Sequence, residues 1–132
     1  MSSLREECGV FGVYSGETSD VASTAYYGLF ALQHRGQESC GIVVNDDGVF
    51  KDYKDTGLVN DVFTPEIIER LGEGNIAVGH ARYGTTGSND RSNAQPIVVN
   101  HIKGKMALAH NGNLVNSGEL RRELELEGSI FH

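Results

Sequence analysis

Short apolar runs separated by tight-turn signals are the feature that most constrains how this chain can fold. Residues 39–44 and 49–53 flank Asn45-Asp46-Asp47-Gly48, and an Asp-Gly step tolerates the positive φ values of a hairpin turn. A second pair of runs, 97–101 and 106–110, flanks Lys103-Gly104-Lys105. Strands joined by such short turns run antiparallel, so the sequence predicts the α+β class rather than a doubly wound parallel sheet.

Helix and strand signals fill the rest of the chain. Helical spacing of apolar residues follows a cap at Ser19 or Asp20, and Thr64-Pro65-Glu66 places a cap, an N1 proline and a first-turn acid in order. The predicted helices are 20–33, 65–71 and 116–126, and the predicted additional strands are 8–14 and 76–82. Residues 83–95 have no apolar period and are predicted to be a loop, of a length that is usually functional or disordered.

Composition excludes two classes of function for this single-domain length of 132 residues. The net charge is −7 and no basic run exceeds Arg121-Arg122, so we expect no nucleic-acid partner. The aliphatic stretches are far shorter than the ~20 residues that a membrane span needs, and residues 1–7 have no apolar signal core. We therefore expect a cytoplasmic protein without a membrane partner, with Cys8 and Cys40 as free thiols.

Cys8 begins a predicted strand after a short polar segment, which favours a nucleophile exposed by removal of that segment. The α-amine of a new N-terminus has a pKa of about 7.7 to 8.0 and can accept the proton of its own thiol. Taken alone, a cysteine in a strand is more often a buried apolar residue, and Cys40 is interpreted as such a core residue. A papain-like pairing of Cys8 with His80 or His110 is a weaker alternative, because Cys8 begins a strand and not a helix.

Four segments place charged or amide side chains beside glycine at the ends of apolar elements. Arg82 can grip a carboxylate through its guanidinium, although a surface ion pair is an equally ordinary role. Asn111 and Gly112 offer two donors for an oxyanion hole, or a type I′ turn. The histidines show no spacing typical of a metal site. The segments are LQHRGQES (32–39), GHARYGTTGS (79–88), SNAQP (92–96) and AHNGNLVN (109–116).

CGVFG at Cys8 and these four segments, in this order, make the chain resemble the N-terminal class-II glutamine amidotransferase domain of the amidophosphoribosyltransferase family. Related amidotransferases that form glucosamine phosphate share the CG start and the HNG turn but typically have tryptophan where this chain has Tyr83. The resemblance implies a four-layer αββα sandwich of the N-terminal-nucleophile hydrolase type. It also implies a leader, residues 1–7, and a glutaminase domain, residues 8–132.

The resemblance further implies a role for individual residues. Cys8 is expected to attack the side-chain amide of glutamine, forming a thioester and releasing ammonia, while Asn111 and Gly112 donate to the oxyanion. Arg82 is expected to hold the α-carboxylate of glutamine. The remaining implied substrate-binding residues are Tyr83 and Thr85, in a loop that closes over glutamine, and Arg35, near the nucleophile.

The resemblance covers only part of a family enzyme. In the family, a phosphoribosyltransferase domain uses the ammonia and phosphoribosyl pyrophosphate to make 5-phosphoribosylamine, the first step of de novo purine synthesis. That domain is absent from this sequence, and so is a downstream aspartate that holds the glutamine α-amino group. The family is homo-oligomeric and uses magnesium and, in some members, an iron–sulfur cluster, both through the absent part, so we expect neither cofactor here. The sequence therefore predicts a truncated, weak glutaminase, with a non-catalytic fragment or regulatory module that retains the fold as the alternative.

Overall fold

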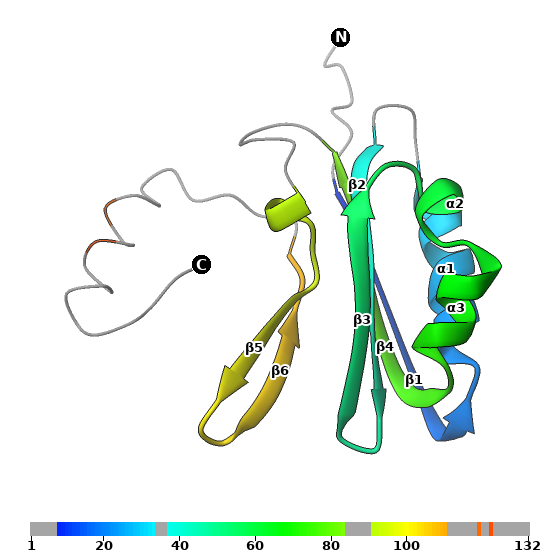
Figure 1. The fold of residues 1–132 in the computed structure, drawn as a ribbon, viewed down its shortest axis with the longest axis vertical. Helices are drawn as coiled ribbons and strands as arrows, with labels where there is room; N and C mark the ends of the chain where they lie inside the picture. Colours follow the sequence, from blue (N-terminus) through cyan, green and yellow to red (C-terminus); the bar gives the residue numbers. More distant parts are fainter. Residues whose placement is uncertain (1–7, 34–36, 84–90, 111–118, 120–121, 123–132) are drawn as a thin grey trace, which may run out of the picture.

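Antiparallel sheet makes up most of the described structure, with helices on the outer face of the larger sheet (Figure 1). The structure, a computed structural model, describes residues 8–33, 37–83 and 91–110 together with Glu119 and Arg122. The strands are β1 (Gly9–Ser19), β2 (Gln37–Asp46), β3 (Val49–Thr56), β4 (Gly74–Tyr83), β5 (Ile97–His101) and β6 (Gly104–Leu108). The helices are α1 (Val21–Leu32), α2 (Val59–Val62), α3 (Pro65–Leu71) and a 3-10 turn, η1 (Arg91–Asn93).

Strand β4 lies inside the larger sheet, whose strand order is β1-β4-β2-β3 with every neighbour antiparallel. It pairs Ala81 with Gly9 of β1 and with Cys40 of β2. Because side chains alternate between the two faces of a strand, this register sends alternate β4 residues to opposite sides of the sheet. Both predicted hairpins are present, and the antiparallel pairing confirms the α+β prediction. In the second hairpin the predicted strand 106–110 instead runs from Gly104 to Leu108, because His101 already pairs with Gly104.

The helices cover one face of this sheet and bury the main core. Leu29 of α1 is fully buried and sits against Gly79 of β4, where an added Cβ would be 2.9 Å from the Leu29 side chain. Burial of a leucine side chain is worth about 1.5 to 3 kcal/mol. Glycine at 79 therefore lets α1 approach the sheet closely. The core also contains Val21, Ala25, Cys40, Ile42, Val44, Ala77 and Ala81.

Local capping signals begin both predicted helices in the described part of the chain. The Asp20 side chain accepts a hydrogen bond from the Ser23 N–H at 3.2 Å, and Thr64 Oγ1 accepts from the Ile67 N–H at 3.4 Å. Each bond satisfies a donor that the first helical turn leaves unpaired. Helix α3 has the predicted bounds, whereas α1 begins and ends one residue inside the prediction. Helix α2 was not predicted.

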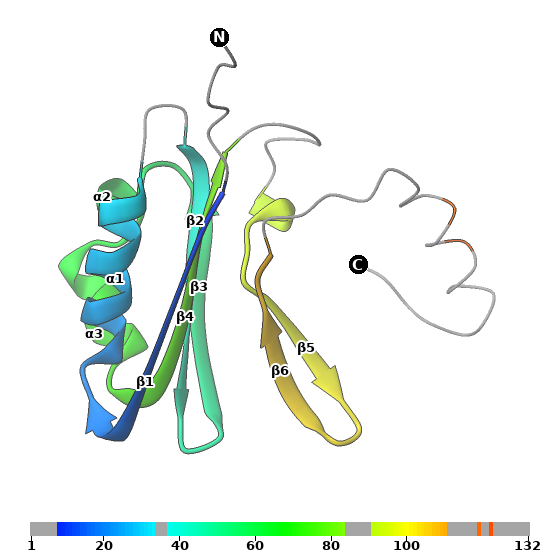
Figure 2. The same cartoon turned by 180° about the vertical axis from the view of Figure 1, so that it is seen from behind.

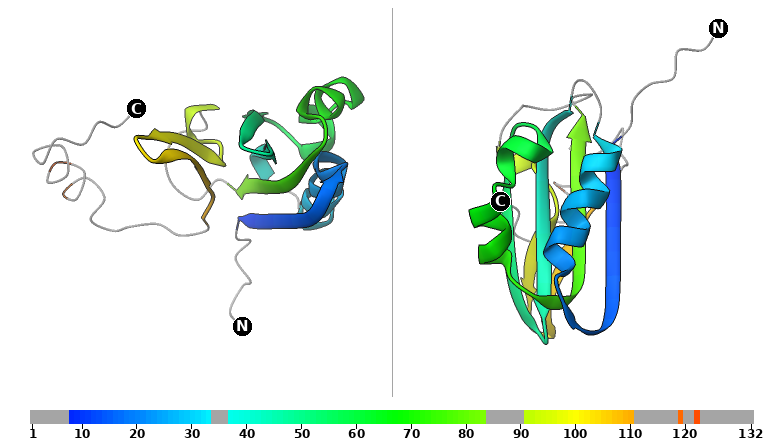
Figure 3. Two further views of the ribbon diagram at one scale, coloured as in Figure 1. Left: turned by 90° about the horizontal axis from the view of Figure 1, so that it is seen from below. Right: turned by 90° about the vertical axis from the view of Figure 1, so that its right-hand side faces the viewer.

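The β5–β6 hairpin lies on the face of the sheet opposite the helices (Figures 2 and 3). The chain approaches this face closely before β5, because a Cβ added at Gly41 of β2 would lie only 2.1 Å from the Gln95 carbonyl oxygen. Arg91 in η1 also donates to the Lys54 carbonyl oxygen of β3 at 3.0 Å. The described residues thus form a helical layer, a four-stranded sheet and a two-stranded sheet.

Some predictions fall outside the described residues. These are the leader (1–7), most of the predicted loop at 83–95, and the helix at 116–126 except Glu119 and Arg122, which are helical. Within the predicted loop, Tyr83 instead ends β4, and Arg91–Asn93 form the 3-10 turn. The second helical layer of the four-layer sandwich stays a prediction.

Candidate active site

Cys8 lies at the end of the sheet where β1 begins and β4 ends. Its Sγ accepts a hydrogen bond from the backbone N–H of Tyr83 at 3.5 Å, and its thiol is free and half-buried. The bond follows from the sheet register, because Gly9 pairs with Ala81 and the preceding residue therefore meets the last residues of β4. A half-buried cysteine at a strand end is a position that a small substrate can approach.

Arg82 and Tyr83 leave this strand end toward opposite faces of the sheet. Tyr83 is buried on the helical side, where its hydroxyl donates to the Leu32 carbonyl oxygen at the end of α1, at 3.0 Å. Arg82 points to the other side and donates through Nη1 to the Asn93 carbonyl oxygen at 3.2 Å. The planar guanidinium fork of Arg82 has the shape that binds a carboxylate through two parallel hydrogen bonds.

His80 and Gln95 meet on the backbone of His110, on the same side of the sheet as Arg82. His80 is fully buried, and its Nε2 is 3.0 Å from the His110 carbonyl oxygen. Because a carbonyl oxygen only accepts, the His80 Nε2 carries the hydrogen of this bond. The His110 N–H donates to Gln95 Oε1 at 2.8 Å. The residue immediately before Asn111 is thus bound through both of its backbone polar groups.

Gln37, in the LQHRGQES segment, is a structural residue in the described part of the chain. It is buried, donates to the Ser39 and Gly57 carbonyl oxygens at 2.8 and 2.6 Å, and accepts from the Val59 N–H at 3.2 Å. These bonds fasten the start of β2 to the chain that leads into α2.

Cys40 has a different environment from Cys8. It is fully buried in the core, which confirms its interpretation as a core residue, and its thiol donates to the Gly57 carbonyl oxygen at 3.9 Å. Burial, reinforced by the Asp55 carboxylate and opposed by a hydrogen bond with Gln37, raises the pKa of Cys40 from 9.0 to about 12. Because the thiolate is the reactive form, Cys40 is the inert thiol of the pair.

The structure brings three of the predicted site residues to one end of the sheet: Cys8, Arg82 and Tyr83. The other four predicted residues, Arg35, Thr85, Asn111 and Gly112, lie outside the described residues. Gln95 was not predicted as a site residue, and His80 was named only in the weaker alternative of a papain-like pair with Cys8, whereas its Nε2 bonds to the His110 carbonyl oxygen. Their only sequence signal is membership of the GHARYGTTGS and SNAQP segments, because the contacts with His110 span 30 and 15 positions.

No ligand set for magnesium or an iron–sulfur cluster is found in the part of the chain that the structure describes. Among those residues, no three of the His, Cys, Asp and Glu side chains gather closely enough to hold a metal ion. The described helices likewise include none that could traverse a bilayer.

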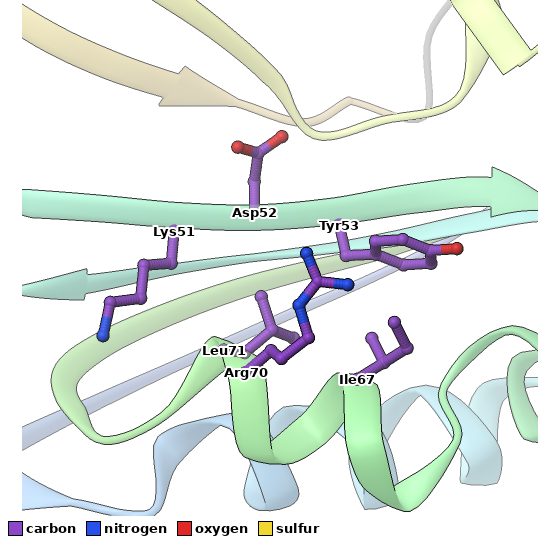
Figure 4. Close-up of a pocket in the computed structure, with 6 residues that line it drawn as sticks. All are labelled: Lys51, Asp52, Tyr53, Ile67, Arg70 and Leu71. Atoms are coloured by element: carbon purple, nitrogen blue, oxygen red, sulfur yellow. The ribbon is translucent and has the colours of Figure 1, made fainter.

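A separate pocket of about 250 Å³ lies on the helical side of the sheet, between β3 and α3 (Figure 4). In this view Lys51 and Arg70 flank the pocket beside Tyr53, while Asp52 points to the opposite side of the strand. None of the predicted site residues lines it. This pocket and the Cys8 end of the sheet are therefore distinct features.

Comparison with known proteins gives consistent relatives, although no family model matches the chain. Amidophosphoribosyltransferase of Methanocaldococcus jannaschii is 56% identical over 124 residues, which cover 94% of this chain and 26% of that protein. The human amidophosphoribosyltransferase is 49% identical over 132 residues, which cover 95% of this chain and 26% of that protein. The chain thus spans about a quarter of the length of these curated relatives.

Solved structures agree with the sequence relatives. The structure described as the allosteric regulatory enzyme of purine biosynthesis matches with a TM-score of 0.80 and 43% identity, over 93% of this chain and 26% of that chain. Glutamine phosphoribosylpyrophosphate amidotransferase from B. subtilis matches with a TM-score of 0.76 and 41% identity over the same shares. By sequence and by fold, this chain belongs to the amidophosphoribosyltransferase family and spans about a quarter of the length of the members compared.

Proposed function

We propose that this chain is a glutaminase domain that hydrolyses glutamine to glutamate and ammonia, with Cys8 as the nucleophile. The observation that carries the proposal is the Cys8 thiol at the end of the sheet, bound to the Tyr83 N–H at 3.5 Å, beside Arg82 on the same strand end. In a full-length family member, the ammonia would pass to phosphoribosyl pyrophosphate and give 5-phosphoribosylamine, in the first step of purine synthesis. The setting expected for the whole enzyme is a cytoplasmic homo-oligomer.

The first chemical step requires a free amine on Cys8, so the proposal includes removal of residues 1–7. The α-amine takes the thiol proton, and the sulfur attacks the side-chain amide carbon of glutamine. The resulting tetrahedral oxyanion accepts hydrogen bonds from Asn111 and Gly112. The carbon–nitrogen bond then breaks, ammonia leaves with the transferred proton, and a thioester remains. Water hydrolyses the thioester to glutamate and restores the thiol.

Substrate orientation falls to the residues around the nucleophile. The Arg82 guanidinium grips the glutamine α-carboxylate with two parallel hydrogen bonds, for which its planar shape is suited. Tyr83, whose side chain is buried against the end of α1, contributes its backbone N–H to the Cys8 sulfur. Thr85 is proposed to act in a segment that closes over glutamine, and Arg35 to act beside the nucleophile. Exclusion of bulk water by such a segment would strengthen the hydrogen bonds to the oxyanion.

A non-catalytic module is the second candidate, and exposed apolar residues on the β5–β6 hairpin favour it. Ile102, Met106 and Leu108 are 95%, 54% and 51% exposed. Apolar side chains gathered on one hairpin are typical of a surface that another protein element covers. This candidate predicts that the chain folds without turning over glutamine.

The test is the intact mass of the purified chain before and after incubation with 6-diazo-5-oxo-norleucine, a diazo-ketone analogue of glutamine. We expect loss of residues 1–7 and a single adduct at Cys8, together with ammonia release from glutamine. Cys8→Ala should abolish both the adduct and the ammonia. Cys40→Ala is the matched control, and both should persist in it because Cys40 is buried away from the site.

The outcomes separate the two candidates. Ammonia release that survives Cys8→Ala would refute the thioester chemistry. A folded chain that keeps residues 1–7 and takes up no adduct would favour the non-catalytic module instead.

A further inference from the structure

The backbone of His110 is held from two directions by side chains of different elements. His80 comes from β4, in the middle of the larger sheet, and donates through Nε2 to the His110 carbonyl oxygen at 3.0 Å. Gln95 comes from the segment before β5 and accepts from the His110 N–H at 2.8 Å. His110 is an exposed residue, and both of these bonds are made by its main chain. We call these two bonds the His110 clamp.

The two residues that form the arms of the His110 clamp, His80 and Gln95, are closely packed over the same part of the larger sheet. His80 is fully buried and pairs in register with Gly41 of β2. Gly41 is also the residue against which the Gln95 carbonyl oxygen packs, since an added Cβ would be 2.1 Å from that oxygen. One glycine therefore lets the two arms approach each other over the same part of the sheet. Closely packed groups of this kind hold a partner more rigidly than exposed side chains do.

The clamp acts on the peptide group that leads into the proposed oxyanion hole. The His110 carbonyl and the Asn111 N–H belong to one planar peptide unit. A hydrogen bond to that carbonyl therefore limits the rotation of the unit. A site that stabilises an oxyanion depends on donors whose directions are set before the reaction begins.

We propose that His80 and Gln95 are positioning residues for glutamine hydrolysis, which orient the peptide preceding Asn111 and Gly112 through the His110 clamp. The inference rests on the proposed function. Neither residue needs to touch glutamine, because each acts through the His110 backbone. The clamp sets how well the oxyanion is stabilised, whereas Arg82 sets how tightly glutamine binds.

The test uses variants of the full chain that remove or retain one arm of the clamp. Gln95→Met removes the acceptor at similar length, and Gln95→Glu restores an acceptor. His80→Met removes the donor, and His80→Gln restores an N–H near the position of Nε2. Asn45→Ala is the matched control, because Asn45 Oδ1 accepts from the Gly48 N–H at 2.7 Å in the turn at the opposite end of the sheet.

Three readouts are compared: steady-state glutaminase kinetics, alkylation of Cys8 by iodoacetamide, and hydrogen exchange of the His110 N–H. Loss of an oxyanion donor itself lowers kcat by roughly 10² to 10³. Loss of an arm that only positions such donors should lower kcat by about tenfold to hundredfold, because small misplacements cost up to ~10²-fold. We expect the KM for glutamine and the rate of alkylation by iodoacetamide to stay within about twofold of the wild-type values, because neither glutamine binding nor thiol alkylation uses the oxyanion hole. Hydrogen exchange of the His110 N–H should accelerate in Gln95→Met and not in the other variants. The kcat for glutamine should be partly restored in Gln95→Glu and in His80→Gln.

Each contrary result has a distinct meaning. Wild-type kinetics in both Gln95→Met and His80→Met would overturn the clamp and leave the proposed function intact. A parallel fall in kcat and in the iodoacetamide rate would show general damage to the site, and would also overturn it. A folded wild-type chain that releases no ammonia would overturn the function and, with it, the clamp's role, even if His110 exchange shows that the bonds form.

Discussion

Replacing Gly41 with Ala should destabilise the protein and loosen the contact between its two sheets. The new Cβ would lie 2.1 Å from the Gln95 carbonyl oxygen and 2.9 Å from the Lys54 Cβ. Real Cβ atoms essentially never approach other heavy atoms within 3.0 Å, so the carbonyl must retreat by at least about 0.9 Å. Overpacking of this kind typically costs about 1 to 3 kcal/mol. A shift of that size also pulls Gln95 away from the His110 N–H, now 2.8 Å from its Oε1.

Urea unfolding followed by circular dichroism measures this cost directly. The matched control is Gly12→Ala in β1, on the same face of the sheet, where an added Cβ meets nothing within 4 Å. Gly12→Ala should change the free energy of unfolding by no more than about 0.5 kcal/mol, or raise it slightly by restricting the unfolded chain. The reasoning is refuted if Gly41→Ala is as stable as Gly12→Ala and protects the His110 N–H from exchange equally well.

Two more predictions concern charge. Because the pKa of Cys40 is raised from 9.0 to about 12 in the fold, its neutral thiol stabilises the folded state fully below pH 9. That contribution is lost as the pH rises toward 12, by up to roughly 1.4 kcal/mol per pH unit. Urea unfolding of Cys40→Ala between about pH 8 and pH 11 should lack this alkaline decline, and pH profiles parallel to the wild type would contradict the assignment. Arg82→Lys should raise the KM for glutamine at least about tenfold, because an ammonium lacks the paired donors of guanidinium. Iodoacetamide, which has no carboxylate, should alkylate Cys8 in Arg82→Lys at the wild-type rate, and an equal loss for both reagents would argue against carboxylate binding.

Elements with local signals could be predicted from the sequence almost to the residue. Helix α3 begins at Pro65 after the Thr64 cap and ends before Gly72, whose φ is +68°, a conformation that glycine adopts freely. The first hairpin likewise turns at Asp47 and Gly48, both with positive φ. In these places the residues that determine the structure are neighbours in the chain, so the local sequence is enough to predict the element.

Elements that depend on distant partners were missed or shortened. Helix α2 has no side-chain cap of its own, and its first N–H is accepted by Gln33 and Gln37, more than 20 positions away. Strand β1 continues past its predicted end at Tyr14 to Ser19, because Ser19 still pairs with Gly74 after an irregularity in the register. The strand order, with β4 between β1 and β2, is equally non-local.

In the candidate site, too, residues with a local sequence signal could be predicted and contacts between distant residues could not. Cys8 and Arg82 could be selected because their side chains have conspicuous chemistry beside glycine or at a strand end. The contact of His80 could not be predicted, because its partner is the backbone carbonyl of a residue 30 positions later and the sequence suggested only a weak pairing with Cys8. The contact between Cys8 and Tyr83 was also invisible, since the group that Tyr83 offers is its backbone N–H, which every residue except proline carries.

The alternation along β4 limits how this protein can vary in length. Ala81 and Tyr83 pack toward the helices, while His80 and Arg82 face the other sheet. A single residue deleted before His80 would exchange these two sets, placing the His80 imidazole where Gly79 now meets Leu29 and the small Ala81 beneath His110. The turn at Asp47 and Gly48 carries no such constraint, because it is solvent-exposed and residues inserted there lie outside the paired parts of β2 and β3. Length variation among homologues, and insertion of a reporter peptide, should therefore be tolerated at that turn and excluded from β4.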